Sequence, residues 1–126
     1  MTIRGVRGAT TIEADQPEGV LAATSELLTA ILEANPTMQP EDLASAFFTV
    51  TEDIHSAYPA RAARQLGWVN VPLMCAREMD VPKGLPLCIR VLLHWNTNLP
   101  QQAVRHVYLR EAVRLRPDLA AGQPKP

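Results

Sequence analysis

The stretch that decides the fold reads MCAREMDVPKGLPLCIRVLLHW and covers residues 74–95. Its second half, residues 87–95, is apolar at almost every position, which predicts a strand buried on both faces of a sheet. One face would carry Leu87, Ile89, Val91, Leu93 and Trp95. The other face would carry Cys88, Arg90 and Leu92. The pattern therefore predicts that Arg90 is a charge inside a sheet.

A guanidinium cannot neutralise itself by losing its proton, so Arg90 needs an anion or several hydrogen-bond acceptors fixed around it. One possibility is a structural ion pair with a carboxylate of the protein. The other is an anionic ligand held in a polar pocket. The same stretch holds two further polar groups. Cys75 lies just before the loop over residues 76–86, and Glu78 lies within that loop.

The totals restrict the class of protein. A chain of 126 residues is long enough for one domain, residues 1–126, with a core of its own. The net charge of -1 argues against a nucleic-acid partner and against an anionic membrane surface, since both require a basic excess. Ten of the twelve basic residues are arginine, which favours bidentate contacts with carboxylates, although a GC-rich genome would give the same bias.

The two cysteines, Cys75 and Cys88, could pair, but an isolated pair in a chain with no signal peptide favours reduced thiols. The chain starts with a predicted strand rather than with a charged and then apolar leader, and it holds no apolar run near twenty residues. We therefore expect a soluble protein in the cytoplasm.

Residues 3–12 have the β-branched ends of a strand and contain two glycines, Gly5 and Gly8. Glycine inside a strand usually means that another backbone or a ligand comes close. Arg7 stands between the two glycines and is the second candidate for binding an anion. The alternative for Arg7 is an arginine on an edge strand, in contact with water.

Asp15 and Glu18 have the spacing of a capping box, which predicts the start of a helix. Apolar residues then recur every three or four positions until Asn35 and Pro36. This would be the one long helix, and its single apolar stripe predicts that it lies on a sheet.

The remaining elements are short. Gln39 would begin a second helix, and residues 46–51 would form the second strand, with both phenylalanines in the core. A helix of about two turns would lie between Pro59 and Gly67. A third strand over residues 68–75, a fifth over residues 105–109, a segment of uncertain form at 111–119 and a frayed tail at 120–126 complete the chain.

Arg61 and Arg64 are three residues apart and would share one face of the helix after Pro59. Such a pair on a surface is normally just solvated, but beside an anionic pocket it would attract an anion. The sequence does not decide whether this arginine pair is only solvated or attracts an anion.

Several chemistries lack a matching motif. The histidines and cysteines are not spaced as zinc ligands, and the glycines near Arg7 lack the lysine or third glycine of a nucleotide-binding loop. We therefore expect neither a metal nor a nucleotide cofactor. Nothing places a histidine beside Cys75 as a general base, and general acid/base work by Glu78 is equally unsupported.

Four separated blocks resemble one family, the monofunctional AroH-class chorismate mutases of the Bacillus type. The blocks are IRGVRGATT at residues 3–11, Cys75 with EMD at 78–80, CIRV at 88–91, and RHVYL at 105–109 with LRPDL at 115–119. They occur in the right order, and the likeness extends from residue 3 to about residue 119.

The resemblance implies an α+β fold, a five-stranded mixed sheet with one long helix and short helices. It also implies a homotrimer whose sheets form a central pseudo-α/β-barrel, with active sites between neighbouring subunits. The implied reaction is the Claisen-type rearrangement of chorismate to prephenate in aromatic amino acid biosynthesis, which needs no cofactor and no protein nucleophile. Negative charge develops on the ether oxygen, so a fixed donor there stabilises the transition state, and Arg90 would be that donor.

Carried over from the family, the catalytic set would be Arg90, Glu78, Arg7 and Cys75. Arg7 and Arg90 would hold the substrate's carboxylate and ether oxygen, Glu78 would accept the ring hydroxyl, and Cys75 would lie near that hydroxyl. The other substrate-binding residues would be Tyr108, Leu115 and Arg116, with Tyr58, Ala60, Arg64, Leu73 and Met74 coming from the adjacent subunit.

The chain departs from the family pattern between residues 58 and 68. It has Tyr58 and Arg61 where other members have Phe and Lys, and the segment after Arg64 is one residue shorter.

Two other functions would also use an arginine pocket. One is an imine-hydrolysing protein on a similar barrel, and the other is a regulatory protein that binds a dicarboxylate. Neither of them requires Glu78 and Arg90 together.

Overall fold

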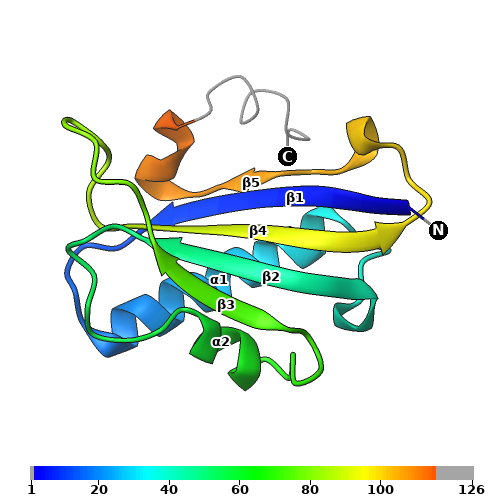
Figure 1. Cartoon of the computed structure of the whole chain (residues 1–126), viewed down its shortest axis with the longest axis horizontal. Helices are drawn as coiled ribbons and strands as arrows, with labels where there is room; N and C mark the ends of the chain where they lie inside the picture. Colours follow the sequence, from blue (N-terminus) through cyan, green and yellow to red (C-terminus); the bar gives the residue numbers. More distant parts are fainter. Residues whose placement is uncertain (1, 116–126) are drawn as a thin grey trace.

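The computed structural model describes residues 2–115, and its centre is a pair of long strands, β1 (Thr2–Thr11) and β4 (Cys88–Thr97). They run antiparallel along their whole length, with Thr2 opposite Thr97 and Thr11 opposite Cys88. β2 (Leu43–Val50) lies antiparallel to the other side of β4. β3 (Leu73–Arg77) pairs in parallel with β2, and β5 (Val107–Tyr108) pairs in parallel with β1. The sheet is therefore mixed and five-stranded in the order β3-β2-β4-β1-β5, which confirms the predicted fold class (Figure 1).

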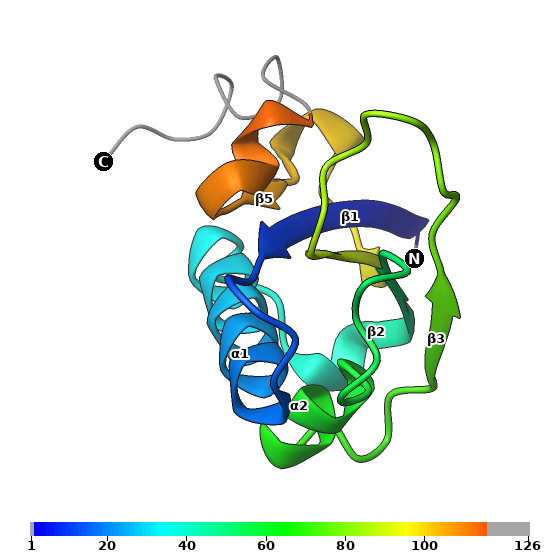
Figure 2. The same ribbon diagram turned by 90° about the vertical axis from the view of Figure 1, so that its left-hand side faces the viewer.

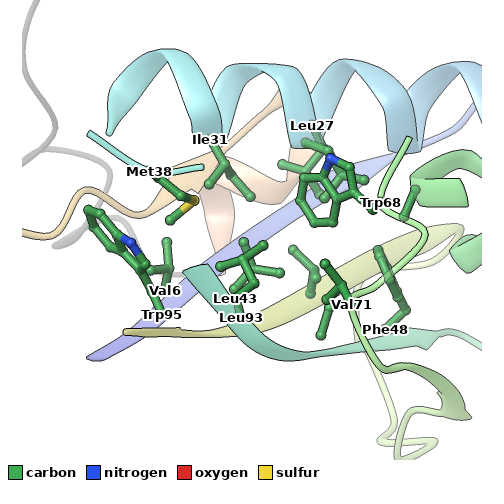
Figure 3. Close-up of a cluster of buried hydrophobic side chains, with 14 of the residues drawn as sticks. Val6, Leu27, Ile31, Met38, Leu43, Phe48, Trp68, Val71, Leu93 and Trp95 are labelled. Atoms are coloured by element: carbon green, nitrogen blue, oxygen red, sulfur yellow. The ribbon is translucent and has the colours of Figure 1, made fainter. Parts of the chain in front are cut away.

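One face of the sheet is covered by α1 (Pro17–Ala34), as its single apolar stripe predicted (Figure 2). Leu27 and Ile31 of the helix meet Val6, Phe48 and Leu93 of the sheet in the main core. Figure 3 shows these side chains packed between helix and strands, with Trp68 and Trp95 beside them. Burying this apolar surface supplies the main free energy of folding.

Gly8 allows α1 to approach the sheet closely. A Cβ atom at this position would lie 2.8 Å from Ile31 Cδ1 and 3.2 Å from Leu27 Cδ1. A close approach is therefore present at this glycine, but it involves side chains of α1 and Val91 of β4 rather than the backbone or ligand that the pattern predicts. At Gly5 the corresponding distance to Leu92 Cδ1 is 3.8 Å, an ordinary contact, so the described residues show no close approach there.

The prediction that β4 is buried on both faces is wrong. Ile89, Val91, Leu93 and Trp95 are at most 2% exposed, whereas Leu92 on the opposite face is 37% exposed. The reason is that α1 covers only one face of the sheet. The same alternation corrects a second prediction, because Phe48 is buried in the core while its neighbour Phe47 is 42% exposed.

Two further predictions need correction. Asp15 does not cap α1, since the helix begins after Gln16 without a side-chain cap. The Asp15 carboxylate instead accepts the N–H groups of His55 and Ser56, at 2.9 and 3.1 Å. The third strand begins at Leu73 rather than at Trp68, because Trp68 precedes it in a turn and fills the core.

The short elements complete the fold. α2 (Ala60–Gln65) lies between Pro59 and Gly67, as predicted. Three 3-10 helices are η1 (Pro40–Asp42), η2 (Gln101–Ala103) and η3 (Arg110–Arg114). The predicted frayed tail at 120–126 lies outside the described residues. No helix within residues 2–115 is long and apolar enough to cross a membrane.

Candidate active site

Arg90 lies near the start of β4, on the face of the sheet that α1 leaves open. Its neighbours across the sheet are Thr49 of β2 and Ala9 of β1. Its Nη1 atom lies 3.5 Å from Oε2 of Glu78, and the two side chains are 29% and 25% exposed. The structural ion pair that the sequence suggested therefore exists, and it is partly open to solvent.

Glu78 follows β3 and is held by three hydrogen bonds. Its N–H donates to the carbonyl of Val50, which attaches the segment to the end of β2. Its carboxylate accepts the N–H of Met79 at 2.9 Å and the hydroxyl of Thr49 at 3.2 Å. The Met79 N–H, followed by Arg90, Thr49 and Arg7, lowers the pKa of the carboxyl below its ordinary 4.5, and partial burial opposes this. Glu78 is therefore an ionised acceptor at neutral pH.

Two polar atoms on this face lack a hydrogen-bond partner within the described part of the chain. They are Nε of Arg90 and the hydroxyl oxygen of Tyr108. Tyr108 is only 6% exposed and lies opposite Ala9 on the neighbouring strand β5, so both groups border the same strand β1. Buried polar groups normally have partners, so these two unsatisfied atoms are available to a polar group from outside the described residues.

A pocket of about 470 Å³ opens beside the ion pair. Glu78 and Arg90 line it from the sheet side, together with Thr51 and Asp53 at the end of β2. The loop over residues 79–86, between β3 and β4, forms the opposite wall. The volume lies within the usual range for small-molecule sites.

Arg7 shares the face of Arg90. It lies on β1 opposite Leu92, two residues along β4 from Arg90. Its positive charge also contributes to the lowered pKa of Glu78, so its guanidinium acts on the same region. Leu115, just after η3, packs against the small buried cluster of Ala9, Cys88, Tyr108 and Ala112 that flanks this site.

The structure places the Cys75 side chain on the other face of the sheet. Cys75 pairs with Phe48 of β2, and it packs with Phe48 against the core under α1. Burial raises the pKa of its thiol, which the N–H of Ala60 and the charge of Arg64 only partly offset. A neutral thiol on that face is a poor nucleophile, which agrees with the lack of a histidine base.

The backbone of Cys75 has a different orientation from its side chain. β3 is an edge strand, and Glu78 donates its N–H to Val50 while Pro72 accepts from Ala46. In a parallel pair these bonds alternate along the strand, so the N–H of Cys75 points to the open edge of the sheet. The amide and the thiol of Cys75 therefore point in different directions.

The remaining predicted site residues do not gather around Arg90 within one chain. Tyr58 is 72% exposed and Met74 is 61% exposed, both at the β3 edge. Strands β2 and β4 separate that edge from β1, so the edge lies roughly 14 Å from Arg7 at about 4.8 Å per strand. The same side carries buried Ala60, exposed Arg64 and half-buried Leu73, and Arg116 lies outside the described residues.

Sequence reasoning missed two residues of the pocket, Thr51 and Asp53, and a residue that holds Glu78, namely Thr49. Thr49 bonds the Glu78 carboxylate, and the other two line the pocket wall. The sequence signal that could have identified them is the change from apolar to polar residues at the open-face positions where the strand ends. Residues 2–115 hold no group of three or more His, Cys, Asp and Glu side chains that could bind a metal ion.

An α+β sheet with an arginine and a carboxylate at one open pocket defines the class as a protein with a polar small-molecule site. The sequence profile of the family described as chorismate mutase type I matches residues 3–119. The chain therefore belongs to the chorismate mutase type I family.

Named relatives agree with this membership. The chain is 60% identical over 121 residues to the protein named chorismate mutase AroH of Thermus thermophilus, covering 96% of this chain and 99% of that one. It is 50% identical to the protein of the same name from Bacillus subtilis strain 168, covering 95% and 94%. A solved structure of a chorismate mutase from Clostridium thermocellum superimposes with a TM-score of 0.83 at 42% identity, over 86% of this chain and 96% of that one.

Proposed function

We propose that the chain, as a chorismate mutase and hence an isomerase, converts chorismate to prephenate in aromatic amino acid biosynthesis at the Arg90 pocket. The observation that carries this proposal is the pair of Arg90 and Glu78 at 3.5 Å, with Arg90 Nε left without a partner in the described chain. The substrate is a small dicarboxylate with a ring hydroxyl and an ether bond. The pocket offers it a cation and an ionised acceptor side by side.

The reaction is an intramolecular rearrangement, so the protein has to bind, orient and stabilise charge, without a cofactor. As the ether bond breaks, its oxygen gains negative charge. Arg90 donates to that oxygen and therefore stabilises the transition state more than the substrate. The partly covered pocket strengthens this interaction, because the effective dielectric constant there is below that of water.

The other residues select and orient the substrate. The ionised Glu78 accepts the ring hydroxyl, and the edge-facing amide of Cys75 donates to the same hydroxyl from the neighbouring strand. Arg7 binds a carboxylate together with the hydroxyl of Tyr108. Leu115, which packs beside Tyr108, closes over the bound molecule. Because the reaction needs no proton transfer, none of these groups acts as a general acid or base.

We propose further that the functional unit is a homotrimer with sites between subunits. The open face of the sheet exposes four large apolar side chains, three of which lie side by side on neighbouring strands, and a patch of this kind marks a protein interface. These side chains are Ile3, Phe47, Met74 and Leu92. A second subunit would bring Tyr58, Ala60, Arg64, Leu73 and Met74 from its β3 edge to the Arg7 and Arg90 side of the first. Contacts between sheets in a central barrel would bury the patch.

Both thiols are free, with Cys88 buried, and this agrees with the cytoplasmic location that we expect. The enzymatic proposal is tested by following the ultraviolet absorbance of chorismate with the purified protein. We expect the chorismate signal to decay with prephenate as product, and we expect Arg90→Ala to abolish the decay. A folded protein that binds chorismate without turnover would contradict the proposal and favour a dicarboxylate-binding role.

The assembly is tested separately by light scattering. A trimer should have about three times the mass of the 13.8 kDa chain. A monomer in solution would contradict the interfacial site, even if the protein turned over chorismate.

A further inference from the structure

A network of hydrogen bonds joins the end of β2 to the start of β4, next to Arg90 but outside the residues proposed to touch substrate. Both oxygens of the Asp53 carboxylate accept the N–H of Leu87, at 3.2 and 3.0 Å. The hydroxyl of Thr51 donates to Asp53 Oδ1 at 2.6 Å and accepts the N–H of Cys88 at 2.9 Å. The N–H of Thr51 in turn donates to the carbonyl of Cys88 at 3.1 Å. Two side chains therefore fix two consecutive residues just before Arg90.

Leu87 has an unusual backbone conformation that needs such support. Its φ is +50°, in the left-handed region that residues with a side chain rarely adopt. Its N–H is held by Asp53, and its carbonyl accepts the N–H of Ile12 at 2.9 Å. Strained backbone of this kind persists where its surroundings determine it, and it concentrates near functional sites.

The position of Leu87 in the chain connects this strain to the pocket. It separates the loop over residues 79–86 from β4, and Arg90 follows three residues later. The end of β2 also binds the beginning of that loop, through Thr49 and the carbonyl of Val50, which both bond Glu78. One short segment, residues 49–53 at the end of β2 and just after it, therefore holds Glu78 on one side of the pocket and the residues leading to Arg90 on the other.

We propose that Asp53, acting through Thr51 and Leu87, is a positioning residue that sets the Arg90 guanidinium against Glu78 and the bound substrate. The proposal rests on the function proposed above. Asp53 does not donate to the reacting atoms. It fixes the backbone from which the transition-state donor projects, and it fixes the loop that walls the pocket.

A positioning role has a kinetic signature that a purely structural role lacks. Displacement of a donor aimed at the developing charge weakens transition-state binding more than substrate binding, so kcat falls while KM changes little. Small misplacements are costly in such sites, and we expect a loss in kcat of about tenfold or more. A structural role alone would lower the melting temperature and leave kcat per folded site unchanged well below that temperature.

The test compares Asp53→Ala with Asp15→Ala. Asp15 is a matched control because both of its carboxylate oxygens also accept backbone N–H groups, here those of His55 and Ser56, and it lies outside the Arg90 pocket. We expect both variants to melt at a lower temperature than the unmodified protein. We expect kcat for chorismate to fall only in Asp53→Ala.

A second-site change tests the route through Leu87. Glycine adopts a φ of +50° without strain, so Leu87→Gly needs less support from Asp53. We expect the double variant Asp53→Ala with Leu87→Gly to recover part of the lost kcat. If Asp53→Ala does not fold, Thr51→Val removes the hydroxyl between Asp53 and Cys88 at similar side-chain volume, and we expect the same selective loss in kcat.

The outcomes separate the two proposals. If Arg90→Ala loses turnover while the folded Asp53→Ala or Thr51→Val variant keeps normal kcat, the positioning role is overturned and the chorismate mutase function stands. An equal fall of kcat in Asp15→Ala, or no recovery with Leu87→Gly, would also overturn it. No turnover by the unmodified protein would overturn both proposals.

Discussion

The two faces of the sheet are formed by the same strands and have opposite characters. Toward α1, Val6, Phe48 and Leu93 are fully buried. On the other face, Phe47 is 42% exposed and Leu92 is 37% exposed. Because side chains alternate along a strand, adjacent residues of β2 and β4 serve the core and the site in turn. The comparison teaches that stability and activity can be changed separately by substitutions one residue apart.

The largest expected effect is the contrast between Phe48 and Phe47. Phe48→Ala should lower the free energy of unfolding by about 3–5 kcal/mol, because it opens a cavity in the closed face. Phe47→Ala should weaken association of subunits instead, because this side chain lies in the exposed patch. Denaturant unfolding and light scattering measure the two effects. The two faces would not differ in this way if both variants lost much of their free energy of unfolding at a concentration at which both are monomeric.

The next effect is the contrast between two arginines. Arg90→Lys keeps the positive charge but loses the planar fork of donors, so kcat should fall about 10²-fold or more, as for loss of a transition-state donor. Arg4→Lys is the control, because Arg4 pairs with Trp95 on the α1 side and its Nε donates to the Leu99 carbonyl. We expect its kcat to stay within about twofold, since Arg4 does not reach the pocket. Similar losses of kcat in both variants would show that the position of the donor in the Arg90 pocket is not what limits kcat.

A smaller effect separates the two glycines of β1. Gly8→Ala should destabilise the fold by about 1–3 kcal/mol, because its Cβ would come within 2.8 Å of Ile31 Cδ1. Gly5→Ala should be close to neutral, because its Cβ would meet Leu92 Cδ1 at 3.8 Å on the open face. Thermal unfolding of the two variants checks this. Equal destabilisation would mean that the closeness of α1 is not what selects glycine at residue 8.

The smallest expected effect is that of pH. The pKa of Glu78 lies below its ordinary value, because the Met79 N–H, then Arg90, Thr49 and Arg7, favour the carboxylate. A lowered folded-state pKa contributes stability above the unfolded-state pKa, and this contribution is lost as pH falls through the folded-state value. We therefore expect kcat to stay nearly flat between about pH 6 and 8 and to fall only in acid. A bell-shaped profile in the neutral range would indicate proton transfer.

Much of the fold could be predicted from patterns in the sequence. The apolar spacing before Asn35 predicted α1, and Pro59 and Gly67 predicted α2. The long apolar run predicted β4 to within two residues of its observed end. These elements follow from local periodicity and turn chemistry, which depend little on distant contacts.

The errors share a physical cause. The capping box at Asp15 failed because a tertiary contact with the backbone of residues 55 and 56 competes for the same carboxylate. The apolar run predicts that the second face of β4 is also buried, although α1 covers one face only. Hydrophobicity predicts that a side chain will be covered, but it does not say whether the same chain or another one covers it.

The amino-acid sequence by itself determined the family, the order of the main elements, and Arg90, Glu78 and Arg7 as the candidate anion-binding groups. Only the tertiary structure decided that Oε2 of Glu78 and Nη1 of Arg90 lie 3.5 Å apart. It also decided that the thiol of Cys75 packs against the core. It also identified Thr49, Thr51 and Asp53 as the residues that hold the two sides of the pocket. The physical reason is that hydrogen bonds between residues 29 to 37 positions apart depend on strand pairing and register, which no local pattern specifies.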